Sequence, residues 1–438
     1  MVEAKDMPTG WSQITLGEAA DYLNGRAFKS SEWKDHGLPI IRIQNLNDPN
    51  ASFNYTDQEY EARHRIETGN LLFAWSASLG AYIWRNGSAW LNQHIFRVDP
   101  KPFVDKVFLF YFLNSIAAEL YAQAHGSGMV HITKKKFDAI PMLLPPINEQ
   151  RRTVAKIEEL FSELDKGVES LKTARAQLKT YRQSLLSAAF EGRFSRESNH
   201  VVWPIAKFGN VLDYLTSGSR GWAKYYADQG DLFIRAQNLK NDKLDLSDRA
   251  YVSLPDKSEG KRTRVERGDL LVTITGANVT KAGLVEKELG NAYVSQHVAL
   301  CRLNECLLPA FAYWYLMSEL GGRKQLNRMA YGAGKPGLNL DNIKSMDIPI
   351  PGIESQRETV IAIEQKLAIC TKLDSTLDVT IRKIEALRQS ILKRAFEGKL
   401  VPQNPDDEPA SVLLERIRQE QADAPSPKRR KRKTEAPA

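Results

Sequence analysis

Two short motifs in the sequence have residue types and spacing that could carry chemistry. Residues 332–337 (GAGKPG) fit the dinucleotide-binding pattern GxGxxG, but that pattern follows a strand, and the residues before it are typical of a helix. Pro336 also disfavours a phosphate-binding loop. Residues 255–261 (PDKSEGK) resemble the PD…ExK nuclease motif, but the two residues between Asp256 and Glu259 cannot place these carboxylates on neighbouring strands. We therefore predict neither a nucleotide site nor a nuclease site.

Other catalytic patterns are missing from the sequence. An adenine methyltransferase motif of the NPPY type needs a polar residue and an aromatic residue around its two prolines, whereas residues 144–147 read LPPI. No HExxH or GxSxG motif occurs, and the seven histidines are dispersed. Cys301, Cys306 and Cys370 lack CxxC spacing and are expected to be reduced thiols. We predict no catalytic residue, no metal site and no cofactor bound by this chain.

The composition is that of a globular protein of several domains. The chain has 438 residues, of which 42% are hydrophobic and 26% charged. The longest apolar run, residues 107–113, is too short to span a membrane, and the acidic start is unlike a signal peptide, so we expect a soluble, cytoplasmic protein. Residues 428–433 (KRRKRK) supply six of the eight net positive charges, which leaves +2 on the remainder. Any nucleic acid must therefore be bound through local patches or together with other subunits.

The chain contains two copies of one long pattern. The separation between matching residues grows from 192 to 206 through the front part of each copy and then stays constant. Loops on a globular module tolerate such length changes, whereas a packed helix does not. We therefore predict a variable module followed by a rod, twice. The matching pieces are Trp11 and Trp203, 41–46 (IRIQNL) and 234–239 (IRAQNL), 69–72 and 268–271, Gln93-His94 and Gln296-His297, 126–128 and 332–334, Gln150-Arg151 and Gln356-Arg357, and 189–192 and 395–398 (both AFEG).

Each front part is predicted to be an α+β module, and each rod a long helix. The β-rich runs are residues 39–43, 71–75, 93–98, 232–236, 270–275 and 296–302, and the helical stretches are 104–124 and 309–329. After Pro146 and Pro351, apolar residues including Tyr181 and Leu387 recur every three or four positions, which is typical of a coiled-coil seam. Two irregularities stand out: Gly167 should weaken the first rod, and Val168 corresponds to Asp374.

The lengths of helix and linker predict how the copies connect. A helix over residues 147–190 is roughly 65 Å long, and the linker 191–202 spans at most about 40 Å. The second module must then start near the far end of the first rod, so the rods should pair antiparallel with one module at each end, in approximate two-fold symmetry. The expected parts are residues 1–146 (first module), 147–192 (helix), 193–202 (linker), 203–351 (second module), 352–400 (helix) and 401–438 (short helix and basic tail).

The duplicated pieces closely resemble the specificity subunits of type I restriction-modification systems. The resemblance also includes the start Met7-Pro8-Thr9-Gly10-Trp11 with Leu16-Gly17-Glu18, and it covers nearly the whole chain twice. Each piece is weak alone, but their order and duplication are specific. The second rod departs slightly from the pattern, because residues 351–356 (PGIESQ) lack the double proline.

The resemblance implies a subunit that performs no chemistry and directs its partners to a DNA site. In that family each module is a target recognition domain for one half of a bipartite site. The helices space the halves and bind two methyltransferase subunits, and motor-nuclease (restriction) subunits join them. S-adenosylmethionine, ATP and Mg are then expected on the partners. Two alternatives remain open: the recognition subunit of a fused restriction-methylation enzyme of another type, and a coiled-coil scaffold that binds no DNA.

The residues expected to bind double-stranded DNA are polar positions on the loops. Gln and Asn pair with adenine edges, Arg pairs with guanine, and Lys holds phosphates. For the histidines of the two Gln-His pairs, a structural hydrogen bond and a DNA contact both remain open. The expected set is Ser76, Ser78, Gln93, His94, Ser127, His131, Lys134, Lys135, Lys136, Arg264, Thr275, Asn278, Gln296, His297, Lys335 and Asn339.

Other positions, most of them repeated in both copies, have different expectations. The helix starts, with Gln150, Arg151, Gln356 and Arg357, are expected to contact partner subunits. Gln44, Asn45, Gln237 and Asn238 are expected to be scaffold, because two copies that read different sequences should not share their reading residues. Residues 409–421 are predicted to form an amphipathic helix with Val412, Leu413 and Ile417 on one face, and the remaining basic tail is expected to be disordered.

Overall fold

The chain forms two compact units, each with an α+β module. The computed structural model describes residues 7–48, 50–76, 78–123, 133–194, 202–218, 220–255, 259–331 and 337–423. Unit 1 consists of Met1–Glu169 with Thr380–Ala438, and unit 2 of Ser170–Val379. The boundary between the units falls inside both long helices, α5 (Ile147–Phe190) and α9 (Ile353–Phe396). The bounds of α5 confirm the helix expected from the sequence.

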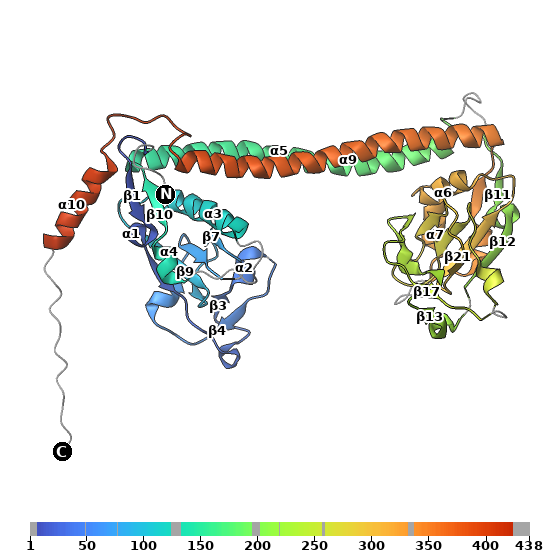
Figure 1. Ribbon diagram of the computed structural model, residues 1–438, viewed down its shortest axis with the longest axis horizontal. Coiled ribbons are helices and arrows are strands. Elements are labelled where there is room, and N and C mark those ends of the chain that lie inside the picture. The colour runs from blue at the N-terminus through green and yellow to red at the C-terminus, as the bar shows by residue number, and fades with distance from the viewer. Residues whose placement is uncertain are drawn as a thin grey trace, which may run out of the picture. The chain divides into compact units, whose positions relative to one another are not determined.

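The module of unit 1 contains two four-stranded sheets. The larger sheet is antiparallel in the order β2-β9-β6-β7, and the smaller one, in the order β4-β3-β8-β5, contains one parallel pair, β3 with β8. A short ribbon, β1 with β10, adjoins α1 (Figure 1). The elements are β1 (Ser12–Thr15), α1 (Leu16–Ala19), β2 (Ala20–Asn24), β3 (Leu38–Ile41), α2 (Ile43–Asn47), β4 (Asn54–Thr56), β5 (Arg65–Ile66), β6 (Leu71–Ala74), β7 (Gly80–Ile83), β8 (Ala89–Leu91), β9 (Ile95–Pro100), α3 (Lys106–Gln123), α4 (Lys134–Asp138) and β10 (Pro141–Leu144).

Unit 2 repeats the larger sheet and three strands of the smaller one, whose fourth strand lies at the opposite edge. Its larger sheet has the order β12-β21-β18-β19, and its smaller sheet, β13-β17-β14-β20, again has one parallel pair, β14 with β20. The elements are β11 (Ile205–Lys207), β12 (Leu212–Ser217), β13 (Tyr226–Ala227), β14 (Asp231–Ile234), β15 (Leu239–Lys240), β16 (Lys243–Leu244), β17 (Tyr251–Val252), β18 (Leu270–Thr273), β19 (Ala282–Leu284), β20 (Ala292–Val294), β21 (Val298–Leu303), α6 (Pro309–Met317), α7 (Gly322–Met329), α8 (Leu340–Ser345) and β22 (Asp347–Pro349); β11 pairs with β22.

Aromatic side chains join each module to a long helix. In unit 1, the ring of Phe396 lies 5.3 Å from that of Phe108 and 5.2 Å from that of Phe112, both on α3. In unit 2, the ring of Phe190 lies 5.2 Å from that of Phe311 on α6. Burial of such a ring is worth roughly 2–3 kcal/mol. The repeated AFEG motif is thus explained, because its Phe fastens the end of the long helix to the module.

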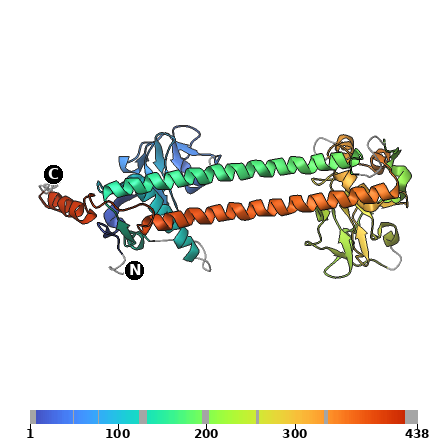
Figure 2. The same cartoon turned by 90° about the horizontal axis from the view of Figure 1, so that it is seen from above.

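The segments of α5 and α9 run antiparallel within each unit, side by side (Figure 2). In unit 2, Arg175 pairs with Asp374 at 3.3 Å and also with Asp378, while Arg182 reaches Asp374 at 3.8 Å. The charge of Asp374, which interrupts the expected apolar seam, therefore has cationic partners on the facing helix. In unit 1, Gly167 does not break α5.

The two-helix pairing leaves some of the expected seam exposed. Tyr181 and Leu387 were both expected in the seam, but they are 53% and 48% exposed. Two helices can cover only one narrow face of each other, so a broad apolar stripe cannot be buried by a single pair.

Three secondary-structure predictions were wrong in detail. The IRIQNL motif is a strand only up to Ile41 and then turns into α2, and its counterpart enters a 3₁₀ turn. Both Gln-His pairs lie in turns that precede β9 and β21, not in the strands. The stretch 309–329 is two helices, because the chain turns at Gly321, where a Cβ would lie 2.9 Å from the ring of Tyr315.

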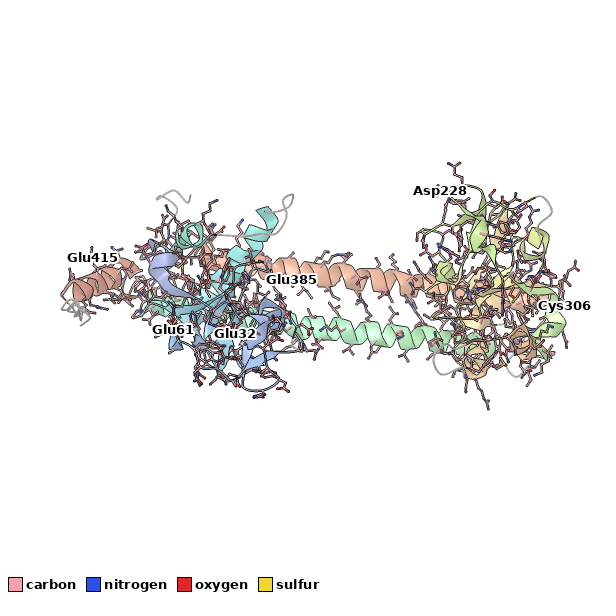
Figure 3. The ribbon with its side chains drawn as sticks, turned by 90° about the horizontal axis from the view of Figure 1, so that it is seen from below. Glu32, Glu61, Asp228, Cys306, Glu385 and Glu415 are labelled. Atoms are coloured by element: carbon pink, nitrogen blue, oxygen red, sulfur yellow. The ribbon has the colours of Figure 1, made fainter. Side chains whose placement is uncertain are left out.

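The C-terminal helix α10 (Ala410–Asp423) packs on unit 1. Ala410 and Leu414 are buried in the same apolar cluster as Ile14 and Leu16, with Leu413 and Ile417 beside them. Val412, which was expected on this face, is 47% exposed, and Leu414 takes its place. Exposed Glu415 lies on the same helix (Figure 3).

Candidate nucleic-acid interface

A tight turn in unit 1 carries Gln93 and His94. The Ile95 N–H donates to the Asn92 carbonyl at 3.1 Å, which closes the turn, and the Trp75 N–H donates to the His94 carbonyl at 3.2 Å. These bonds fix the turn beside the carboxyl end of β6. Gln93 is exposed and His94 half-buried. The Nε2 atoms of the two side chains lie 3.2 Å apart.

Unit 2 has the same turn with the same side chains. The Val298 N–H donates to the Ser295 carbonyl at 3.0 Å, and the Ile274 N–H donates to the His297 carbonyl at 2.9 Å. The Nε2 atoms of Gln296 and His297 are 3.1 Å apart. The geometry of the pair is therefore reproduced in both modules.

The residues after β6 and β18 differ between the modules. Ser76 is only 8% exposed, and the Ser78 N–H donates to its carbonyl at 2.6 Å. In unit 2, the Thr275 hydroxyl is hydrogen-bonded to Nδ1 of His297, and the Asn278 amide donates to the Ala236 carbonyl at 3.2 Å. Thr275 and His297, selected from separate stretches of sequence, are thus brought together, whereas Ser76 has little surface to offer.

A third segment joins this site in unit 2. Gly337 and exposed Tyr331 exchange two backbone hydrogen bonds of 2.8 and 3.0 Å, and the Leu338 N–H donates to the Ile274 carbonyl at 2.8 Å. Gly337 also forms a β-bridge with Thr275. Asn339 caps α8, because its side-chain oxygen accepts the Asn342 N–H at 2.7 Å. The sequence did not single out Tyr331, although an exposed aromatic residue beside a glycine-rich segment is a usable signal.

The predicted cationic residues differ in their exposure and in whether they form ion pairs. Lys134 forms an ion pair with Asp138 at 2.7 Å, while Lys135 and Lys136 are exposed on α4. Arg264 is exposed next to the smaller sheet of unit 2, where its backbone bridges to Tyr293. The remaining predicted positions, Ser127, His131 and Lys335, lie outside the described residues.

The two asparagines that the copies share are scaffold, as expected. The Asn45 side-chain oxygen accepts the Arg42 N–H at 3.1 Å, and its amide donates to the Ser52 carbonyl at 3.0 Å. Asn238 repeats this with the Arg235 N–H at 2.9 Å and the carbonyl groups of two aspartates. Both side chains are buried. The glutamines beside them, Gln44 and Gln237, are exposed, so burial does not assign them to the scaffold.

The expected partner contacts of Gln150 and Gln356 are wrong for these two side chains. Both are fully buried. The Gln150 amide donates to the carbonyls of Phe103 and Pro145 at 3.0 and 2.9 Å, and its oxygen accepts the Asp105 N–H at 2.7 Å. Gln356 makes the same three bonds in unit 2. These side chains tie the helix starts to the modules, whereas Arg151 and Arg357 are exposed and remain candidates for partner contact.

A buried arginine that the sequence analysis missed supports the loop after β18. Arg323, only 3% exposed, donates to the Thr280 carbonyl at 2.7 Å and to the Asp242 carboxylate at 2.5 Å. Tyr313 donates to the Asp242 carbonyl at 2.6 Å, and its burial raises its pKa to about 12, with the Asp242 charge adding to the rise. Residues 242 and 323 are far apart in sequence, so no local motif indicates this pair.

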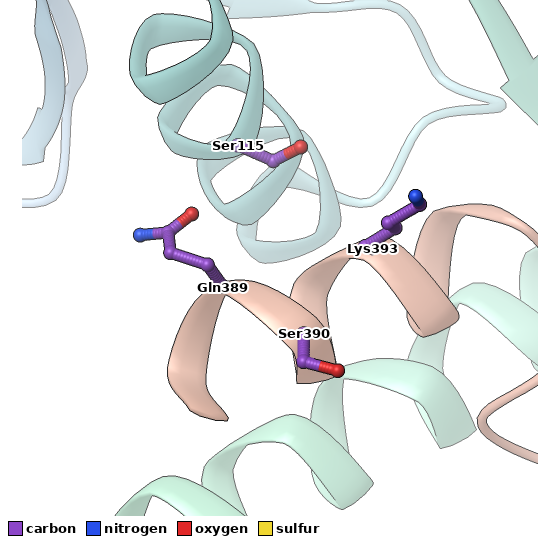
Figure 4. A pocket seen from close by; sticks show the side chains of 4 residues that line it. All are labelled: Ser115, Gln389, Ser390 and Lys393. Atoms are coloured by element: carbon purple, nitrogen blue, oxygen red, sulfur yellow. The ribbon is translucent and has the colours of Figure 1, made fainter. Parts of the chain in front are cut away.

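The described residues show no arrangement typical of a catalytic centre. No group of three or more His, Cys, Asp or Glu side chains within them could hold a metal ion. Cys306 is a free thiol at the surface of unit 2 (Figure 3). An open pocket between α3 and α9 in unit 1 is lined by Ser115, Gln389, Ser390 and Lys393 (Figure 4), without an acid-base pair. Among the described helices, none is both long and apolar enough to cross a membrane.

Comparisons with known proteins also find the duplication. The family model of the type I restriction modification DNA specificity domain matches residues 8–179 and 215–383, once in each copy. The chain therefore belongs to the type I restriction-modification specificity family. It is 26% identical to the type I restriction enzyme EcoBI specificity subunit of Escherichia coli over 94% of this chain and 92% of that protein.

Two solved structures share the fold. A chain from a structural study of complex assembly and conformational transition of the type I R-M system matches with a TM-score of 0.67 and 19% identity, covering 90% of this chain and 99% of that one. The HsdS subunit from Thermoanaerobacter tengcongensis matches with a TM-score of 0.54 and 20% identity, covering 90% and 98%. Family membership thus assigns this protein as a specificity subunit that recognises DNA sequence.

Proposed function

We propose that each module reads one half of a bipartite, gapped DNA site, and that this chain performs no chemistry itself. The observation that carries the proposal is that two modules share one sheet scaffold and one anchored turn, while the neighbouring side chains differ. The clearest difference lies beside the histidine, which contacts the Trp75 ring in unit 1 and the Thr275 hydroxyl in unit 2. Different side chains at equivalent places on one scaffold suit two half-sites of different sequence.

The polar residues of the site suit contacts to bases, and the cationic residues suit contacts to phosphates. Amide and hydroxyl groups, such as those of Gln93, Gln296 and Thr275, have the donors and acceptors that read base edges. Exposed lysines such as Lys135 and Lys136 suit phosphate contacts, which add affinity and set the register on the duplex. Since the chain outside its basic tail is nearly neutral, we expect strong DNA binding only in a complex with other subunits.

The long helices are the proposed contact for two methyltransferase subunits, which restriction subunits would join in the cytoplasm. In unit 2, Ile361, Ile369 and Leu373 of α9 are 53%, 61% and 51% exposed. Apolar side chains exposed at this level on one helix are typical of an interaction face. S-adenosylmethionine, ATP and Mg would then be bound by the partners, which would supply methylation at adenine N6 and ATP-dependent cleavage.

The test is co-expression of this chain with its methyltransferase subunit, followed by mapping of N6-methyladenine across the host genome. We expect one motif with two defined halves and a fixed gap between them. The control is the methyltransferase subunit without this chain, which should leave no such motif. A methylation pattern of one continuous motif, or methylation by this chain alone, would contradict the proposal.

A further inference from the structure

The Gln-His pair is the same in two modules whose neighbouring residues differ. Gln93 and His297 are exposed, and their partners His94 and Gln296 are half-buried. A group retained for folding would be expected in the interior, like Asn45 and Asn238. A pair that is both duplicated and at the surface therefore suits a ligand feature that recurs in the two halves of the site.

The histidine holds the glutamine amide in one orientation. In unit 2, one arrangement satisfies every contact: the His297 Nδ1–H donates to the Thr275 hydroxyl, and Nε2 accepts an N–H from the Gln296 amide. In unit 1, the His94 ring lies 5.5 Å from that of Trp75, and its Nδ1 is buried without a hydrogen-bond partner among the described residues. Its Nε2 faces the Gln93 amide, so the same arrangement forms when His94 carries its proton on Nδ1. Each histidine thus occupies one of the two N–H groups of its glutamine.

The remaining edge of each amide is open. Within the described residues, no protein group is hydrogen-bonded to the side-chain oxygen of Gln93 or Gln296, and the second N–H of each amide is likewise available. One acceptor and one donor side by side match the N6 amino group and N7 of adenine in the major groove, a pairing that Gln makes in bidentate form. A neutral amide binds a phosphate more weakly than a charged lysine does, so a phosphate contact is the less suitable role for these glutamines.

We infer that Gln93 and Gln296 each read an adenine at equivalent places of the two half-sites, with His94 and His297 as positioning residues that orient the amides. This inference rests on the proposed function, and it goes further by assigning one shared base contact to modules that otherwise differ.

The experiment uses the complex of the full chain with its methyltransferase subunit and duplexes that carry the mapped site. Each adenine is replaced in turn by 7-deazaadenine, which lacks the N7 acceptor. We expect one adenine in each half-site at which the replacement weakens wild-type binding about tenfold. In the first half-site, replacing this adenine should not weaken DNA binding by Gln93→Ala any further. In the second half-site, replacing the corresponding adenine should not weaken DNA binding by Gln296→Ala any further.

Each variant has an internal control in the other half-site. Gln93→Ala must keep full sensitivity to 7-deazaadenine in the second half-site, and Gln296→Ala must keep it in the first. His94→Ala and His297→Ala should lose most of the sensitivity to 7-deazaadenine in their own half-site, while binding to unrelated DNA stays unchanged. A merely structural histidine would lower binding to all sequences equally.

Several outcomes would overturn the inference. Additive effects of the glutamine variants and 7-deazaadenine would do so, because they would show that the amide and the N7 atom do not interact. Equal weakening on all sequences with a smaller salt dependence would assign the pair to a phosphate instead. Loss of assembly would assign it to the protein partner. If the wild-type complex selected no two-part site, the proposed function would fail, which is a separate result.

Discussion

At the scale of single residues, the pieces of sequence that both copies share contain two kinds of polar side chain. Asn45 and Asn238 are buried, and each bonds several backbone groups of a loop. The Gln-His pairs lie at the surface and leave hydrogen-bonding groups open. Repetition in sequence marks both kinds, and burial separates Asn45 and Asn238 from the Gln-His pairs.

The first prediction concerns Asn238. Asn238→Ala leaves the Arg235 N–H and the Asp245 carbonyl without this partner and removes one of two hydrogen bonds to the Asp248 carbonyl, so it should lower the free energy of unfolding of unit 2 by about 2 kcal/mol. Gln237→Ala is the matched control, because Gln237 is exposed and its amide bonds the exposed Asp248 carboxylate, so the change in stability should be below about 1 kcal/mol. Urea unfolding monitored by fluorescence measures both, and equal effects of the two variants would contradict the assignment.

At the scale of elements, a glycine lies two residues beyond the end of each long helix. Gly192 and Gly398 have φ values of +80° and +71°, and each donates its N–H to a carbonyl three residues earlier. This left-handed conformation favours glycine and ends the helix so that the chain can turn back. The two sites differ in their surroundings: a Cβ on Gly398 would lie 2.5 Å from Pro8, and one on Gly192 at 3.5 Å from Trp203.

The second prediction uses this difference. Gly192→Ala should cost about 1 kcal/mol through backbone strain alone, whereas Gly398→Ala should cost clearly more, because the new methyl group also displaces Pro8. Thermal unfolding of the two variants beside the wild type provides the comparison. Identical losses at both positions would show that the close approach of Pro8 has no energetic consequence.

A third prediction concerns the anchor of the segment before α10. Arg152 forms an ion pair with the largely buried Asp407 at 2.6 Å, and this hydrogen bond holds the pKa of the Asp407 carboxyl below its usual range. A lowered pKa in the folded state means that the stabilisation is present above the ordinary pKa of 3.8 and is lost as the pH falls below it. Since Arg152 is 37% exposed, we expect a contribution of only about 1 kcal/mol.

Limited proteolysis of the C-terminal segment at different pH values tests the anchor. Cleavage near α10 should increase as the medium becomes acidic, and Asp407→Asn should show the higher cleavage already at neutral pH with little further change on acidification. Arg416, which pairs with Glu408 at the surface, provides the control: Arg416→Gln should behave like the wild type. A pH profile that Asp407→Asn left unchanged would assign the acid response to another group.

At the scale of the whole molecule, the duplication makes the modules separable. Each unit has its own sheets and its own buried cluster. Replacing residues 1–144 with the corresponding module of a relative should therefore change one half-site and leave the other intact. Genome-wide mapping of N6-methyladenine measures both halves in one experiment. A change in both halves would be incompatible with independent reading by the modules.

A further prediction at this scale concerns the spacer. Insertion of one heptad into both α5 and α9 lengthens each helix by about 10 Å, or roughly three base pairs at 3.4 Å each. We expect the gap between the half-sites to grow by that amount with both half-sites unchanged. Insertion into α5 alone is the control, because it destroys the match between the paired helices and should abolish methylation. An unchanged gap in the double insertion would show that the helices do not set it.

The sequence by itself determined the features that repetition and local chemistry encode. The two modules, the absence of catalytic motifs and the bounds of α5 follow from repeated motifs and from proline and glycine at helix ends. Tertiary structure decided which polar residues are exposed and can contact DNA or a partner subunit. Gln150 and Gln356 are buried by loops more than 40 residues away, and Arg323 finds Asp242 across 81 residues. Local pattern cannot show such contacts, because they depend on how distant segments pack and which side chains that packing leaves in solvent.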